Sequence, residues 1–168
     1  NLKMSFDIDK ELQQNCDSFF YDLNLDKIYK PSLLRLLSAS DFALSQFKKN
    51  PNLFSDLILE NNLNKSRTKL DHKTNLDNLI ENSQANYTSL LRLYRNKEMC
   101  RIAWRAIGFS IKVEIIIEEL SYLADQCLLN SLEFATTLIS QKHRAPLTKS
   151  GELQQLYIVA LGKLGGRE

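Results

Sequence analysis

The chain has 168 residues, of which 43% are apolar and 25% charged, and its 22 basic residues nearly balance its 20 acidic ones. These values are typical of a folded domain with one core, and they exclude a disordered chain, a collagen-like repeat and a disulfide-stapled miniprotein. The net charge of +2 is too small to indicate a nucleic-acid partner. Leucine is abundant, whereas valine occurs only at Val113 and Val159. This supply favours helices over a sheet, so the sequence predicts a mostly α protein.

The cysteines and the apolar runs indicate the compartment. Cys16, Cys100 and Cys127 lie far apart and form no C-x-x-C pair, so they indicate neither a zinc site nor a disulfide framework. Free buried thiols of a reducing compartment are the expectation. No apolar run reaches the ~18 residues of a membrane span, and the first residues carry no signal-peptide pattern. We predict a cytoplasmic protein without a membrane partner.

Helical spacing of apolar residues predicts four helices in the first third of the chain. Asn50-Pro51 interrupts this region, because the residue before a proline is pushed out of the helical conformation. The predicted helices are 9–25, one with Pro31 in its first turn, 42–49 with Ser40 as its N-cap, and one that restarts at Leu53.

The middle of the chain changes character twice. Residues 61–77 are polar and rich in Asn and Lys, so we predict a mobile loop that leads into a weak helix at 75–85. His72, in this loop, has no acid or thiol at ligand spacing and is assigned no function. Two long helices follow, at 87–109 and 112–140. Their short connection predicts an antiparallel hairpin, the backbone of a helical bundle.

One strand is predicted near the C-terminus. After a polar loop at 142–152, Leu156–Leu161 forms a short continuous apolar run that ends in glycine, which is typical of a buried strand. A single strand is not stable alone, because its backbone donors and acceptors need a partner ladder. A pairing partner is therefore missing from this sequence.

A glycine turn follows that strand directly, at Gly162–Glu168. The adjacent glycines Gly165 and Gly166 would let the backbone approach a phosphate closely, and Lys163 could add a positive charge. The order differs from a P-loop, because the lysine precedes the glycine pair. The alternative is a plain tight turn after a strand.

Basic residues gather on the first long helix. Arg101 and Arg105 are four residues apart and share a helix face, with Arg92, Arg95 and Lys97 nearby. They could line a nucleotide cleft or grip an acidic partner, since arginine binds phosphate and carboxylate in a bidentate manner. The alternative is a solvated helix face with local ion pairs, such as Glu98 with Arg101 or Arg105. Trp104, among apolar neighbours, is interpreted as a packing residue.

Three segments together resemble the bifunctional glutamine synthetase adenylyltransferase/adenylyl-removing enzyme in order and spacing: Leu91–Arg105, Glu119–Asp125 and Val159–Glu168. Ser38–Phe42 followed by Asn50-Pro51 is similar to the early helical region of that family, so the likeness covers roughly residues 33–168. The Arg-Ile-Ala-Trp motif and the long helical region before the glycine turn resemble the N-terminal half of the family, which removes adenylyl groups.

The resemblance implies a two-part organisation. Residues 1–140 would be the helical region, and residues 141–168 would be the loop, first strand and glycine turn of an incomplete nucleotidyltransferase domain of the DNA polymerase β type. In the family, two carboxylates that bind Mg²⁺ follow the glycine motif, and this chain stops at Glu168 before them. No catalytic residue and no metal ligand is therefore assigned here, and the isolated chain is expected to be inactive. Gly165 and Gly166 would face the nucleotide or phosphate, with Lys163 as a helper.

The implied reaction of the longer enzyme is phosphorolysis of adenylyl-tyrosine on glutamine synthetase, which releases ADP. Its cofactors would be Mg²⁺ and ATP, ADP or phosphate, and its partners glutamine synthetase and the nitrogen-sensing PII protein. The alternative is a non-catalytic helical protein-interaction module, in which the arginine-bearing helix docks a protein surface. Nucleic-acid binding through the same helix is a third reading, which the charge does not favour.

Overall fold

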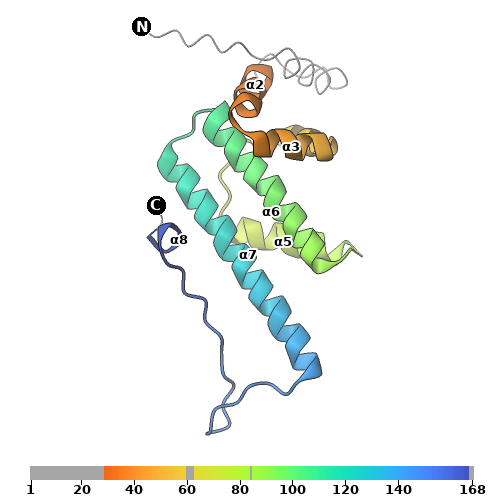
Figure 1. Ribbon diagram of the computed structural model, residues 1–168, viewed down its shortest axis with the longest axis vertical. Coiled ribbons are helices and arrows are strands. Elements are labelled where there is room, and N and C mark those ends of the chain that lie inside the picture. The colour runs from red at the N-terminus through yellow and green to blue at the C-terminus, as the bar shows by residue number, and fades with distance from the viewer. Residues whose placement is uncertain (1–28, 60–62, 84, 167–168) are drawn as a thin grey trace. The chain divides into compact units, whose positions relative to one another are not determined.

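The computed structural model describes residues 29–59, 63–83 and 85–166 (Figure 1), and the helix predicted at 9–25 lies outside them. The described part of the chain is mostly helical, as predicted, with seven α-helices and one π-helical segment. They are α2 (Tyr29–Ala39), α3 (Asp41–Lys49), α4 (Asn52–Leu59), α5 (Lys69–Glu81), α6 (Tyr87–Ala103), η1 (Trp104–Gly108), α7 (Val113–Lys142) and α8 (Lys163–Gly166). Among these helices, none is long and apolar enough to cross a membrane.

The starts and stops of the first helices follow from local residue chemistry. Ser40 caps α3, as predicted, and its hydroxyl accepts a hydrogen bond from the Ala43 amide at 3.2 Å. Asn50 is the C-cap of α3, and α4 begins at Asn52 directly after Pro51. The predicted break at Asn50-Pro51 is therefore confirmed.

The loop predicted over residues 61–77 is wrong in its second half, because α5 already begins at Lys69. Its start is fixed by a capping box: the Thr68 amide donates to the Asp71 carboxylate at 2.7 Å, and the Asp71 amide donates to the Thr68 hydroxyl at 3.2 Å. His72 and Leu76, one helical turn apart, are both fully buried. The two buried side chains and the capping box therefore stabilise a helix here despite the polar composition of the segment.

Two long helices form at nearly the predicted bounds, while their antiparallel packing stays a prediction. The first of them changes at its end, where η1 continues α6 as a π-helix. There the Phe109 amide donates to the Trp104 carbonyl at 3.2 Å, five residues back. Ser110 follows with a positive φ of 53°, and α7 begins at Val113.

The structure differs from the prediction at Leu156–Leu161, which has no regular secondary structure. Within the described ranges, β pairing is limited to one isolated antiparallel bridge between Leu147 and Leu153. The physical reason is the one that makes single strands unstable: no described segment supplies a second ladder for Leu156–Leu161.

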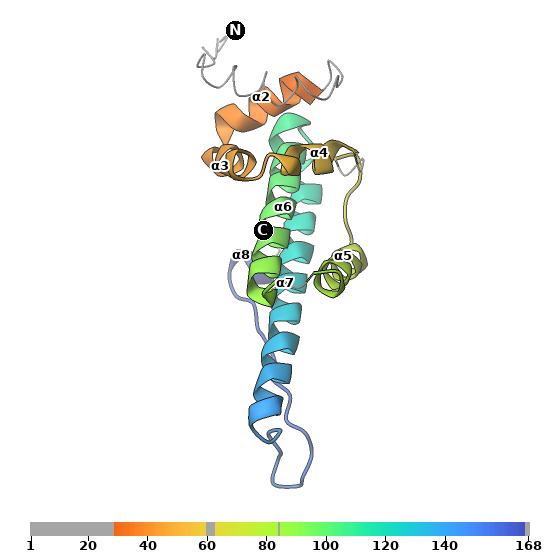
Figure 2. The same ribbon diagram turned by 90° about the vertical axis from the view of Figure 1, so that its right-hand side faces the viewer.

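The chain divides into two compact units, each described here by itself. The first comprises the described residues up to Ser66 together with Arg92–Ile116. Its core surrounds Trp104, which is fully buried and forms ring contacts with Phe47, at a centroid distance of 5.9 Å, and Phe54, at 5.7 Å. The Trp104 indole donates to the Ser32 hydroxyl at 3.0 Å. Trp104 is thus a packing residue, as predicted, and Figure 2 shows α3 and α4 beside the C-terminal part of α6.

The second unit comprises Arg67–Leu91 and Ile117 onward. Lys69, at the start of α5, forms a 2.6 Å ion pair with Asp125 of α7. At the start of α6, the Tyr87 ring stacks on Phe134 with 3.9 Å between centroids. These contacts join α5 and the first turn of α6 to α7.

Candidate functional site

The predicted phosphate site is the glycine turn, and the structure shows why glycine stands at one of its positions. A Cβ atom on Gly165 would lie 2.4 Å from the Ala160 carbonyl oxygen, which is far inside van der Waals contact. The turn closes on itself, since the Gly166 amide donates to the Gly162 carbonyl at 2.8 Å. Any residue larger than glycine at position 165 would force this turn open.

The chemistry that this turn offers follows from its backbone. Lys163, Gly165 and Gly166 all belong to α8, a single helical turn, so the predicted site residues are brought together. Gly165 and Gly166 are exposed and leave the backbone open to an approaching group. The Gly166 amide, however, is already engaged by Gly162. A phosphate could therefore approach the exposed backbone of the two glycines, but the Gly166 amide is already hydrogen-bonded within the turn.

The candidate arginines Arg101 and Arg105 are buried, with exposures of 0% and 3%. Arg101 forms an ion pair with Glu98, also fully buried, at 2.8 Å, and donates to the Lys65 carbonyl at 3.1 Å. Of the two ion pairs considered from the sequence, Glu98 with Arg101 is confirmed, but in a buried rather than a solvated setting. Burial removes both charges from water, and this cost is offset only where further hydrogen bonds satisfy the remaining polar groups. The Lys65 carbonyl accepts one such bond from Arg101.

Arg105 holds the same connection between α4 and α5. Its guanidinium donates to the Leu63 carbonyl at 2.7 Å and to the Ser66 hydroxyl at 2.9 Å. Together Arg101 and Arg105 fix residues 63–66 through backbone and hydroxyl oxygens. The arrangement supports a scaffolding role, because contact with a phosphate would require these internal hydrogen bonds to break.

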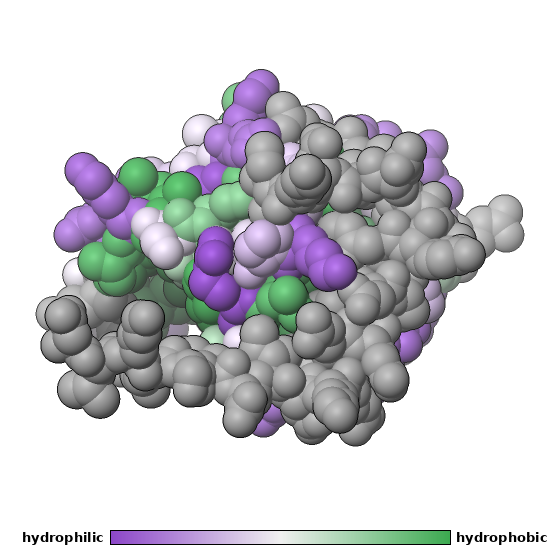
Figure 3. Space-filling view, turned by 90° about the horizontal axis from the view of Figure 1, so that it is seen from above, coloured by the Kyte–Doolittle hydropathy of each residue, from purple (hydrophilic) through white to green (hydrophobic). Residues whose placement is uncertain are grey.

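The other basic residues of α6 are exposed at Arg92 and Arg95 and half-buried at Lys97. The Arg95 guanidinium donates to the Asn96 side chain at 2.9 Å. Lys97 pairs with Asp56 of α4 at 3.6 Å. Figure 3 shows hydrophilic and hydrophobic side chains of the described residues interspersed on the face that it draws.

The structure adds residues that the sequence analysis assigned no role. Glu119 is almost fully buried and accepts a hydrogen bond from the Arg67 amide at 3.1 Å. One and two turns further along α7, Tyr122 and Asp125 contact the Lys69 ammonium, which lies 5.7 Å from the Tyr122 ring centroid. Their spacing of three residues on one helix face was the signal available in the sequence.

Thiols and metal donors complete the inventory. Cys100 is buried, as expected, and burial raises the pKa of its thiol to about 12. Cys127 is partly exposed. Among the described residues, no group of three or more His, Cys, Asp or Glu side chains could hold a metal ion. The described residues therefore supply no magnesium site.

Comparison with known proteins defines the family. The sequence profile for GlnE, glutamate-ammonia ligase adenylyltransferase, matches residues 31–168. The chain therefore belongs to the GlnE family of adenylyltransferases.

Individual relatives agree with the profile. The chain is 32% identical over 150 residues to the bifunctional glutamine synthetase adenylyltransferase/adenylyl-removing enzyme of Psychromonas ingrahamii, a match that covers 88% of this chain and 16% of that protein. It is 27% identical over 163 residues to the enzyme of the same name from Hahella chejuensis, covering 96% of this chain and 17% of the relative. The chain thus spans about one sixth of the length of these relatives.

Proposed function

We propose that this chain is part of an enzyme that adenylylates and deadenylylates glutamine synthetase, and that it belongs to the N-terminal, adenylyl-removing half. The observation that carries the proposal is the family match to residues 31–168, which extends through the glycine turn. The assignment to the adenylyl-removing half rests on the sequence motif Arg101–Trp104 and on the long helical region that precedes the glycine turn.

The reaction of the longer enzyme would be phosphorolysis. An oxygen of inorganic phosphate attacks the phosphorus of the adenylyl group, and the bond from that phosphorus to the tyrosine oxygen breaks. The products are ADP and the unmodified tyrosine side chain of glutamine synthetase, whose oxygen takes up the proton that the attacking phosphate gives up. In this scheme residues 141–168 open a nucleotidyltransferase domain, with Leu156–Leu161 as its first strand. Gly165 and Gly166 would face the phosphate or nucleotide, and Lys163 would supply positive charge.

The helical residues would serve as the scaffold that carries this domain. Arg101 and Arg105 support this scaffold role, because both guanidinium groups donate hydrogen bonds to residues 63–66, which connect α4 and α5. Mg²⁺ would be held by carboxylates outside the described residues. Adenylylated glutamine synthetase would be the substrate, and the PII protein the regulator.

The test uses the full reading frame that contains this chain. Purified protein is incubated with adenylylated glutamine synthetase, Mg²⁺ and inorganic phosphate, and ADP release is measured with and without PII. We expect ADP to form at a rate that PII changes, and the 168-residue chain alone to form none. If the longer protein retains adenylylation activity but releases no ADP, the assignment of this chain to the adenylyl-removing half is wrong.

A pair of glycine variants tests the turn within that assay. Gly165→Ala places a Cβ against the Ala160 carbonyl, so we expect at least a tenfold loss of rate, the roughly 1.4 kcal/mol of a modest misplacement. Gly151→Ala controls for the backbone strain of replacing a glycine without a clash, since its φ is 85° and nothing lies within 4 Å of its Cβ position. Equal rates for the two variants would remove the glycine turn from the proposed site.

A further inference from the structure

The basic residues of α6 and η1 divide into two groups in the structure. Arg101 and Arg105 are buried and donate hydrogen bonds to residues 63–66. Arg92 and Arg95, three residues apart on α6, share one face of the helix, and both are exposed. Like charges one helical turn apart repel each other and destabilise a helix. The exposed pair therefore needs a different explanation from the buried pair.

Two amide side chains place a third cation beside this pair. The Asn96 amide nitrogen donates to the Gln46 amide oxygen of α3 at 3.2 Å, and Arg95 donates to the Asn96 amide oxygen at 2.9 Å. On α3, Lys49 is exposed and lies one turn after Gln46. On α6, Arg92 lies one turn before Asn96. Lys49, Arg92 and Arg95 are called the α3–α6 cluster below.

The three charges of the α3–α6 cluster act together on an approaching ligand. Each of its outer members, Lys49 and Arg92, is one helical turn of about 5.4 Å from the amide pair. This spacing is shorter than the Debye length of about 8 Å at physiological salt. The fields of the three cations therefore overlap at the surface where α3 meets α6.

The carboxylates near the α3–α6 cluster are already engaged. Glu98 pairs with Arg101 at 2.8 Å and is fully buried, and Asp56 pairs with Lys97 at 3.6 Å. Among the described residues, no ion pair includes a member of the cluster. The cluster therefore presents positive charge that the described residues do not neutralise, although the repulsion within it costs stability. Binding of an anionic partner would offset that cost.

The residue types of the cluster suit a protein surface that is rich in carboxylates. A guanidinium group binds carboxylate in a bidentate manner, and arginine is enriched in protein interfaces. Leu93, next to Arg92 in the sequence, is 47% exposed and adds apolar area beside the charges. A nucleic-acid site commonly neutralises about six to ten phosphates, which is more than three cations supply. The observations thus favour an acidic protein partner.

We propose that the α3–α6 cluster docks an acidic surface of glutamine synthetase. The proposal rests on the proposed function, which makes that protein the substrate. The cluster would hold the substrate protein and take no part in the transfer of the adenylyl group. Interactions that are equal in the bound substrate and in the transition state lower KM and leave kcat unchanged.

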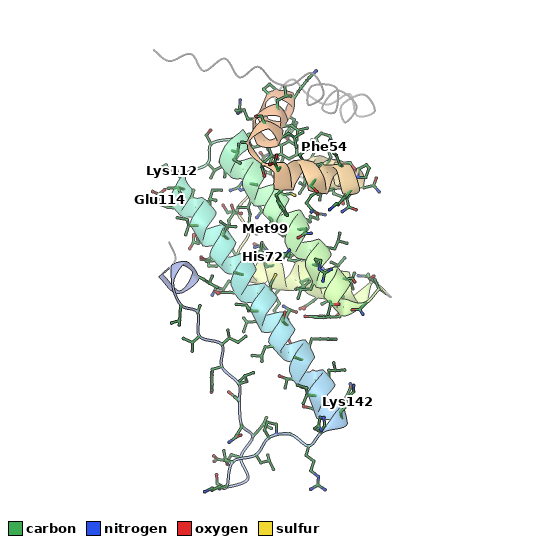
Figure 4. All side chains as sticks on the ribbon, in the orientation of Figure 1. Phe54, His72, Met99, Lys112, Glu114 and Lys142 are labelled. Atoms are coloured by element: carbon green, nitrogen blue, oxygen red, sulfur yellow. The ribbon has the colours of Figure 1, made fainter. Side chains whose placement is uncertain are left out.

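The test compares two charge reversals in the full reading frame that contains this chain. Arg92→Glu reverses one charge of the cluster, and Lys112→Glu reverses an exposed charge elsewhere in the same unit. Figure 4 labels Lys112 just before α7, beyond the C-terminal end of α6. We expect Arg92→Glu to raise the KM for adenylylated glutamine synthetase roughly fivefold with kcat unchanged, because like charges then meet across the contact. We expect Lys112→Glu to change neither constant.

The 168-residue chain separates docking from folding. Arg92→Glu replaces a like-charge pair with an opposite-charge pair at the same spacing, so we expect the unfolding midpoint to stay at or above the wild-type value. A substitution that weakens binding and leaves the fold equally stable identifies a docking residue. A lower unfolding midpoint for Arg92→Glu would show that Arg92 supports the fold, and would overturn the proposal.

Binding of adenylylated glutamine synthetase to the longer protein is measured without phosphate, at low and at physiological salt. We expect the wild-type affinity to fall as the salt concentration rises, and Arg92→Glu to raise Kd roughly fivefold at low salt. Equal Kd values for Arg92→Glu and Lys112→Glu would overturn the proposal. So would tighter binding of duplex DNA than of glutamine synthetase, if Arg92→Glu weakens it, because the cluster would then be a nucleic-acid site.

ADP release separates this proposal from the proposed function. If the longer protein releases ADP with the same KM in both variants, the proposed function holds and the docking surface is wrong. If it binds glutamine synthetase through Arg92 but releases no ADP, the docking surface exists and the proposed reaction is wrong. A longer protein that neither binds nor modifies glutamine synthetase overturns both.

Discussion

Two regions of this molecule use similar residues with opposite results. Around Trp104, leucine and phenylalanine side chains from α2, α3 and α4 are almost completely buried. Along the C-terminal half of α7 and the segment after it, leucine, isoleucine and phenylalanine remain at the surface. The difference is in the supply of opposing elements: three short helices surround Trp104, and the described residues place no comparable layer over the exposed apolar side chains of α7. Apolar sequence alone does not make a core.

The first prediction tests this difference in packing by removing one aromatic ring from each region. Trp104→Ala should cost about 3–5 kcal/mol in the free energy of unfolding, because the ring is fully buried and the cavity cannot collapse easily. Phe134→Ala should cost less than about 2 kcal/mol, since Phe134 is 36% exposed and its main ring contact is the stack on Tyr87. Urea unfolding followed by circular dichroism measures both. Equal costs would mean that the two regions are packed alike.

The second prediction concerns the buried ion pair of the Trp104 region. Arg101→Met removes the guanidinium that balances Glu98, both groups being fully buried, and should cost about 3 kcal/mol. Adding Glu98→Leu should recover most of that cost, because an apolar pair of similar volume can replace a buried ion pair. Arg95→Met, at an exposed position on the same helix, is the control and should cost less than about 0.5 kcal/mol. A double variant no more stable than Arg101→Met would contradict this account.

The helices were largely predictable because their signals are local. Ser40 and Asn50-Pro51 act through neighbouring backbone groups, and apolar spacing alone locates the two long helices. The start of α5 was missed although its capping box, Thr68 with Asp71, is also a local signal. There the Asn- and Lys-rich composition concealed a helix that is fixed by its cap and by two buried positions, His72 and Leu76.

The candidate site was predictable only in part, because its remaining features depend on distant residues. The glycine turn could be read from the sequence as a turn. The burial of Arg101 and Arg105, by contrast, results from carbonyl groups about 40 residues away, at Leu63 and Lys65, which periodicity cannot reveal. The missing strand at Leu156–Leu161 has the same origin, since a strand requires a partner that no local pattern provides.

A third prediction sharpens the comparison at the π-helical end of α6. A Cβ on Gly108 would lie 2.4 Å from the Trp104 ring and 2.9 Å from the Ser32 carbonyl oxygen. Gly108→Ala should therefore push the ring out of place and cost about 2 kcal/mol, as overpacking of a filled core does. Trp104 is the single tryptophan of the chain, so its fluorescence spectrum reports the displacement directly. Unchanged fluorescence and stability would show that this end of α6 is loosely packed.

The smallest expected effect concerns the cap of α5, in the second unit. Hydrogen bonds from the Thr68 amide and hydroxyl hold the pKa of Asp71 below its ordinary value of 3.8. Because the folded-state pKa is depressed, the ionised cap stabilises the fold above that value, and the contribution is lost as the pH falls through the lowered pKa. Asp71→Asn should cost about 0.3–1 kcal/mol at pH 7, because Asp71 is the N3 partner of the N-cap Thr68 and its charge lies in the first helical turn.

The difference between wild type and Asp71→Asn should shrink at pH 3, where protonation begins to remove the charge from the wild-type cap as well. Urea unfolding at both pH values measures this change. Asp77→Asn is the matched control, because Asp77 pairs with exposed Lys73 on the same helix and caps nothing. A pH-independent difference for Asp71→Asn would mean that the cap acts through hydrogen bonding alone, which the asparagine side chain can partly reproduce.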